Sequence, residues 1–137
     1  VADAKDVNNR GALIFAAQEG RIQMCKYLVE QLSIDVNEQD VFGETPVLNA
    51  ARQGQIAIVQ YLIEKGADPA IPSAEGPGAL HHAAGIGHIE LIKLLLSKGV
   101  DVDSQSNVGT PLMWAAGLGQ ENAVKVFLEH HANLHAK

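Results

Sequence analysis

Histidine is the residue type in this chain best suited to chemistry near neutral pH. The six histidines are His81, His82, His88, His130, His131 and His135. The last three lie close together, and residues four apart share one face of a helix, so they are the first candidates for a zinc site. No cysteine or acidic cluster completes a four-ligand set there. We therefore expect no metal, and we expect His130 and His131 to end a helix.

Motifs for covalent or phosphate chemistry are weak. The sequence offers no Ser-His-Asp, Cys-His or HExxH arrangement that neighbouring segments assemble. Gly85-x-Gly87 and Gly117-x-Gly119 resemble fragments of a phosphate-binding loop, but they lack the preceding strand and the lysine, so we interpret them as turns. Cys25 falls on an apolar stripe, which indicates a small core residue and not a reactive thiol. We expect no catalytic residues and no cofactor, so the chain is not expected to be an enzyme.

The composition indicates a folded domain and narrows the class of partner. Of 137 residues, 47% are hydrophobic, and the formal net charge is -6. The 10 basic residues are scattered singly, which argues against nucleic acid. No apolar run approaches the about 18 residues that a membrane span needs. The start, Val1-Ala2-Asp3, has no signal-peptide pattern, and a single cysteine excludes an internal disulfide, so we expect a cytoplasmic or nuclear protein that binds no membrane.

A short sequence motif that recurs four times indicates the architecture. Two alanines are followed by two residues and then a glycine. The phrase begins at Ala16, Ala50, Ala83 and Ala115, at spacings of 34, 33 and 32 residues. Self-similarity at a period of about 33 residues is the signature of stacked structural repeats. A stack offers a long continuous face and no natural crevice for chemistry, so it favours binding.

Each repeat is predicted to contain two short helices. In the second repeat Thr45 can cap a helix start, Pro46 suits the first helical position, and Gly54 permits a sharp reversal. The paired alanines allow helices to approach closely, and an apolar stripe at helical spacing follows in a second helix. First helices are expected to start near Ala12, Pro46, Ala79 and Pro111. Second helices are expected to start near Ile22, Ile56, Ile89 and Glu121.

These motifs together resemble the ankyrin repeat, whose consensus includes Gly-x-Thr-Pro-Leu-His-x-Ala-Ala, then Gly-His, and later Gly-Ala-Asp-Val-Asn. The resemblance covers nearly the whole chain. It implies an all-α solenoid of four helix-turn-helix repeats joined by β-hairpin-like loops. It also implies a single domain over residues 1–137, with repeats at approximately 6–39, 40–72, 73–105 and 106–137.

The four repeats match the ankyrin consensus to different extents. Only His81 retains the histidine that, in ankyrin repeats, ties the hairpin to the helix through hydrogen bonds. The first and third repeats lack the Thr-Pro pair, so their first helices should be less well capped. Less generic phrases, such as that of residues 49–54, resemble the ankyrin part of plant proteins that join ankyrin repeats to a tetratricopeptide domain. No tetratricopeptide unit is present in this chain, so that resemblance implies a chaperone-binding domain outside it.

The resemblance also implies a binding face. Hairpin tips and exposed positions of the first helices line a concave surface, and the second helices form the convex back. The residues expected to contact a partner are Val41, Phe42, Glu44, Arg52, Gln53, Glu75, His82, Ile86, Val108, Trp114 and Leu118. A row that borders this groove is expected just before the alanine pairs, at Phe15, Asn49, His82 and Trp114. Alternatively, Phe15 and Trp114 pack against neighbouring repeats. Apolar residues increase toward the C-terminal half of the face.

A protein–protein interaction scaffold is the favoured function. Two alternatives remain open, namely an ankyrin-type inhibitor that occludes a partner enzyme such as a kinase, and a structural spacer. Both terminal repeats keep apolar residues where a cap would be polar. We therefore expect a piece of a longer array, with flanking repeats or weak end-to-end self-association.

Overall fold

The computed structural model describes residues 11–74 and 76–133, and this part contains eight α-helices. The first helices of the repeats are α1 (Ala12–Gln18), α3 (Pro46–Arg52), α5 (Ala79–Ile86) and α7 (Pro111–Gly117). The second helices are α2 (Ile22–Glu30), α4 (Ile56–Glu64), α6 (Ile89–Ser97) and α8 (Glu121–Glu129). All eight begin at the residues that the sequence predicts. The described residues contain no strand, and none of their helices is long and apolar enough to cross a membrane.

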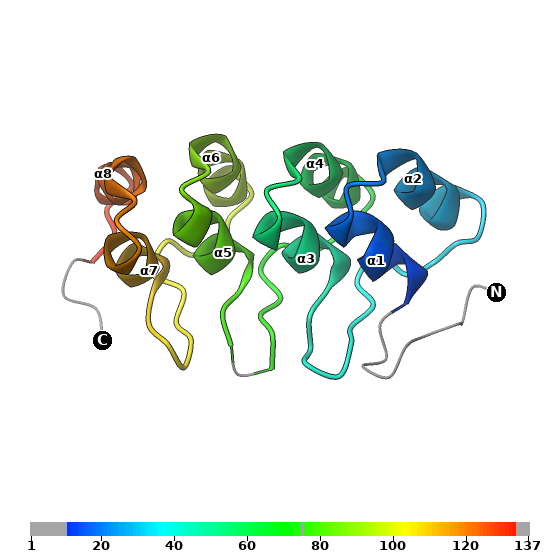
Figure 1. Cartoon of the computed structure of the whole chain (residues 1–137), viewed down its shortest axis with the longest axis horizontal. Coiled ribbons are helices and arrows are strands. Elements are labelled where there is room, and N and C mark those ends of the chain that lie inside the picture. The colour runs from blue at the N-terminus through cyan, green and yellow to red at the C-terminus, as the bar shows by residue number, and fades with distance from the viewer. Residues whose placement is uncertain (1–10, 75, 134–137) are drawn as a thin grey trace.

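The helices form two rows (Figure 1). Helices α1, α3, α5 and α7 make one row, and α2, α4, α6 and α8 make the other. Along the first row α1 packs against α3, α3 against α5, and α5 against α7. The long connections between repeats project together beyond the first row, so that their tips line up along the stack (Figure 1). The architecture is therefore the predicted all-α solenoid.

The helix starts follow from their capping residues. Thr45 Oγ1 accepts a hydrogen bond from the backbone N–H of Leu48, and Thr110 Oγ1 accepts one from Met113, both at 3.3 Å. Gly11 and Gly78 stand at the same place before α1 and α5 and have no side chain to cap with, as predicted. His88 caps α6, because its Nδ1 accepts from the N–H of Leu91 at 3.1 Å.

The reversals between paired helices depend on glycine. The predicted turn glycines have φ angles of 76°, 70°, 70° and 74°, at Gly20, Gly54, Gly87 and Gly119. This left-handed region is costly for residues that carry a Cβ atom, so it confirms why the phrase ends in glycine each time. Gly66 and Gly99 take the same left-handed conformation where the chain leaves α4 and α6 for the long connections. Ser33 and His131 take that conformation after α2 and α8.

The core is a continuous apolar strip between the two rows. The alanine pairs of the second and third repeats are fully buried, which lets the first helices approach one another closely. Cys25 lies in this core with no exposed surface, and burial raises the pKa of its thiol to about 11. The thiol therefore stays protonated and inert, which confirms the interpretation as a core residue.

Candidate functional site

The second repeat begins with a hairpin-like loop whose tip, residues 40–44, is held by Asp40, and the third repeat has the equivalent loop around residues 73–77. Asp40 Oδ1 accepts hydrogen bonds from the backbone N–H groups of Phe42 (2.9 Å) and Glu44 (3.0 Å), and its own N–H donates to Glu44 O (3.1 Å). This closed turn leaves Val41 and Phe42 outside, where they are 58% and 54% exposed. Two large apolar side chains are therefore held at the tip without being packed into the protein.

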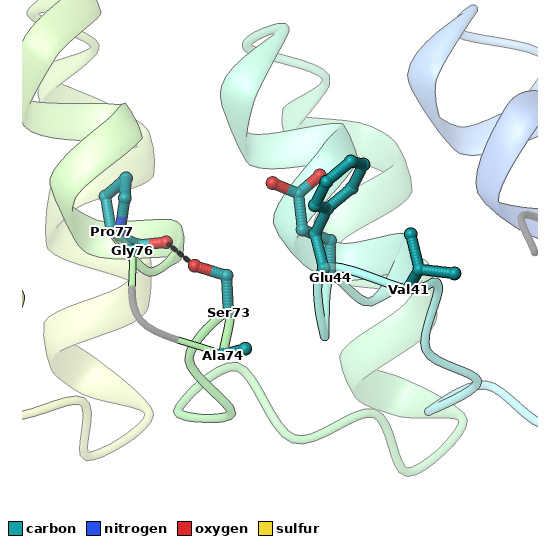
Figure 2. A pocket seen from close by; sticks show the side chains of 7 residues that line it. Val41, Glu44, Ser73, Ala74, Gly76 and Pro77 are labelled. Carbon is teal, nitrogen blue, oxygen red and sulfur yellow. Dashed lines mark hydrogen bonds between the residues drawn. The ribbon is translucent and has the colours of Figure 1, made fainter. Parts of the chain in front are cut away.

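The second and third hairpins face one another across a pocket of about 520 Å³. Figure 2 shows residues of the second hairpin on one side of it, with Ser73, Ala74, Gly76 and Pro77 on the other. The N–H of Ala74 donates to Phe42 O at 2.8 Å, which joins the two hairpins. Gly43 permits this approach, because it has a φ of +75° and a Cβ atom there would lie 2.8 Å from the nitrogen of Ala74.

A polar network links this hairpin to α3. Arg52 forms an ion pair with Glu44, and its Nη1 donates to Asn49 Oδ1 at 3.2 Å. Asn49 Nδ2 in turn donates to Thr45 O at 3.0 Å. Asn49 is fully buried, so the prediction that it borders the groove is wrong. The side-chain amide of Asn49 forms its hydrogen bonds within its own repeat. The neighbouring Arg52 and Glu44 are half-buried and reach the surface.

Trp114 packs against the preceding repeat and remains half-buried. Its ring meets those of His81 and His82 edge to face, at centroid distances of 5.7 Å and 5.5 Å. Its indole Nε1–H donates to Val108 O at 3.2 Å. Trp114 therefore packs against its neighbouring repeat, and the exposed part of its ring remains a candidate for partner contact.

The two histidines that contact Trp114 have different environments. His81 is buried, with Nδ1 accepting from the N–H of Gly78 (3.1 Å) and Nε2 donating to Gly109 O (2.9 Å). This confirms the tie that the ankyrin resemblance implied, and it defines a neutral imidazole. Burial lowers the pKa of His81. Burial, reinforced by Arg52 and His81, lowers the pKa of His82 to about 4, so both rings are neutral near pH 7.

The fourth repeat carries an apolar patch, made of Val108, Met113, Trp114 and Leu118. These side chains, with Gly117, line an open cavity of about 400 Å³. Leu118 is 62% exposed and Met113 is 46% exposed. Met113 is not among the contact residues expected from the sequence, and it occupies the position that the buried residues Ile14, Leu48 and His81 take in the other repeats. Its exposure follows because no further hairpin covers it within the described residues.

The remaining candidates are distributed along the same side of the stack. Ile86 and Gln53 are exposed at the ends of α5 and α3, and Phe15 lies partly exposed on α1. Glu75 lies outside the described residues. We call the exposed surface of the hairpin tips and first helices the inner face; its apolar members include Val41, Phe42, Ile86, Val108, Met113 and Leu118.

No group of three or more His, Cys, Asp or Glu residues suited to a metal ion occurs in the described part of the chain. His130 follows the last residue of α8 and His131 ends the turn after it, as predicted. His135 lies outside the described residues.

Comparison with known proteins agrees with the repeat architecture. A palmitoyltransferase, AKR1, of Lachancea kluyveri is 34% identical over an alignment that covers 98% of this chain but 19% of that protein. An ankyrin repeat-containing protein of Schizosaccharomyces pombe is 28% identical over 73% of this chain and 44% of its own length. The human ankyrin repeat, SAM and basic leucine zipper domain-containing protein 1 is 38% identical over 46% of this chain and 14% of its own. The chain thus spans less than half the length of each relative.

The family itself is identified over both halves of the chain. Residues 1–73 and 70–137 each match the model for ankyrin repeats in three copies. The threonine caps, the glycines at the turns and the buried alanine pairs are the structural features that correspond to the matching sequence motifs. Ankyrin repeats support a role in protein interaction and are not catalytic modules. The chain belongs to the ankyrin repeat family.

Proposed function

We propose that this chain is an interaction module whose partner protein binds the inner face, which we take to be concave. The observation that supports the proposal best is the alignment of exposed apolar side chains on this one side. Phe42 and Val41 project from a tip that Asp40 holds closed, and Leu118 and Val108 belong to the apolar patch of the fourth repeat. Exposed apolar groups that gather on one surface are typical of interaction sites.

The chemistry of the face defines the class of partner. Toward the N-terminal half it presents the paired Glu44 and Arg52 together with Gln53. Toward the C-terminal half it presents Ile86 and the apolar patch. A cytoplasmic protein whose contact surface is polar at one end and apolar at the other fits this gradient. The net charge of -6 disfavours nucleic acid as the ligand.

The test compares two exposed aromatic residues, one at a hairpin tip and one on a second helix. Phe42 on the inner face is 54% exposed and Tyr27 on α2 is 51% exposed, so alanine removes similar surface from each. A photo-crosslinking residue at position 42 should capture a partner that one at position 27 does not. In titrations with that purified partner, Phe42→Ala should weaken affinity about tenfold or more, because buried aromatic anchors dominate interfaces. Tyr27→Ala should leave it unchanged. Equal losses, or a loss only with Tyr27→Ala, would refute the proposal.

The same experiment separates a scaffold from an inhibitor. If the captured partner is an enzyme such as a kinase, adding this chain should leave its activity unchanged for a scaffold and lower it for an inhibitor. A structural spacer would give no saturable binding at either position.

A further inference from the structure

Hydrogen bonds from side chains fix the first repeat to the second. Asn37 Oδ1 accepts from the N–H of Asp68 (2.9 Å), and Asn37 Nδ2 donates to Gly66 O (3.4 Å). In the row of second helices, which we call the outer row, the Tyr61 hydroxyl donates to Glu30. We call this contact between repeats the first joint.

The third and fourth repeats are tied in a similar way at the last joint. Asp103 Oδ1 accepts from the N–H of Asn133 at 2.9 Å, at the position that matches Asn37. Gln120 Nε2 donates to Gly85 O at 3.0 Å, and His81 Nε2 donates to Gly109 O at 2.9 Å. Hydrogen bonds are directional, so each of these ties restricts how one repeat can rotate on the next.

The central joint, between the second and third repeats, lacks every one of the side-chain hydrogen bonds described for the other two joints. Ala70 stands where Asn37 and Asp103 stand, Leu94 where Tyr61 stands, and Leu48 where His81 stands. His88 replaces Gln120, and its Nδ1 caps its own helix instead. Among the described residues, no side-chain hydrogen bond crosses this joint. The bond from Ala74 N–H to Phe42 O joins the hairpins there.

The central joint is also open at both edges. Between the outer helices α4 and α6 lies a cavity of about 380 Å³, lined by Gln60, Ile63, Glu64, Leu94 and Lys98. At the opposite edge lies the pocket of about 520 Å³ between the hairpins (Figure 2). Between these spaces α3 packs on α5, and the alanines Ala50 and Ala83 of these two helices are fully buried. Apolar contact is not directional, so it permits rocking that hydrogen bonds would resist.

We propose that the central joint is a hinge, at which the first two repeats rock as a unit against the last two. Rocking about the α3–α5 contact widens or narrows the space between α4 and α6, while the bond from Ala74 N–H to Phe42 O keeps the hairpins together. Hinges of this kind absorb motion at a few positions while the packed bodies on either side stay rigid. The inference does not depend on the identity of any partner.

The first test measures the three joints with matched spin labels. Lys26, Gln60, Lys93 and Lys125 are each the fifth residue of their second helix, so cysteine pairs at 26/60, 60/93 and 93/125 report on successive joints. The labels are placed in a Cys25→Ala background. Dipolar distance distributions from electron paramagnetic resonance should be broader for 60/93 than for the other two pairs. Three distributions of equal width would overturn the proposal.

The second test restores the missing tie at an exposed position. In Ala70→Asn the new side chain can accept from the N–H of Asp101, as Asn37 accepts from Asp68. Hydrogen exchange at the Asp101 amide should slow about two- to tenfold, the effect of one net hydrogen bond, and the 60/93 distribution should narrow. Conversely, Asn37→Ala should broaden the 26/60 distribution. If Asp101 becomes protected and the 60/93 distribution keeps its width, the joint is not a hinge governed by these ties.

Discussion

At the scale of single residues, His82 shows how an uncharged ring is selected by its surroundings. Its half-buried ring contacts that of Trp114, and burial together with Arg52 and His81 lowers its pKa from 6.5 to about 4. In the unfolded chain the same imidazole regains its ordinary pKa. The folded state therefore excludes a proton that the unfolded state accepts.

This difference makes stability depend on pH below neutrality. Well above pH 6.5 the ring is neutral in both states and adds no pH dependence. As the pH falls from 6.5 toward 4, only the unfolded state becomes protonated, so the free energy of unfolding should fall by on the order of 1–3 kcal/mol from His82. Urea unfolding of the wild type and His82→Gln at several pH values measures the contribution of His82 to this pH dependence. Parallel pH profiles for the two proteins would contradict it.

Ser33 takes a backbone conformation that suits glycine. Its φ is 54°, whereas glycine fills the matching positions after α4 and α6 with φ angles of 98° and 90°, at Gly66 and Gly99. A left-handed conformation costs a residue with a Cβ atom about 1–2 kcal/mol. Ser33→Gly should therefore raise the free energy of unfolding by about 0.5–1 kcal/mol, the gain being reduced by the greater freedom of glycine in the unfolded chain. Gly66→Ser should change it in the opposite sense, and chemical denaturation of both variants tests the pair.

At the scale of elements, the close contact of first helices depends on side-chain size. Ala83 is fully buried on α5, which packs against both α3 and α7. Ala83→Leu should overpack these contacts and lower the free energy of unfolding by about 1–3 kcal/mol. Ala57→Leu provides the control, because Ala57 is exposed on α4 and should change stability by less than about 0.5 kcal/mol. Equal effects in thermal or urea unfolding would mean that the alanines do not set the spacing.

The elements could be predicted from the sequence because each is specified locally. Thr45 and Pro46 mark a helix start and Gly54 marks its end whatever surrounds them. The surface was harder to predict, because exposure depends on the neighbouring repeat. Asn49 and His82 hold the same place in successive repeats, yet Asn49 is buried beneath Arg52 and His82 is not fully covered. Met113 is exposed for the same kind of reason, which periodicity alone does not reveal.

At the scale of the whole molecule, the first and last described repeats each expose a large apolar side chain on their second helix. Met24 on α2 is 51% exposed, and Leu128 on α8 is 44% exposed. Contact between such surfaces on two copies should give weak association, with a dissociation constant of roughly 0.1–1 mM. Sedimentation velocity at rising concentration should detect it, and Leu128→Glu should reduce it. A sedimentation coefficient free of self-association at high concentration would contradict this expectation.

The position of the single tryptophan gives the molecule a built-in optical probe. Trp114 touches two imidazole rings of the third repeat while it belongs to the fourth, so its fluorescence should report separation of these two repeats. It is blind to the first two repeats, whereas far-ultraviolet circular dichroism follows all eight helices. A chain that melts as one unit must give the same transition by both signals. If the two halves melt separately, the emission of one indole will trace the second half alone.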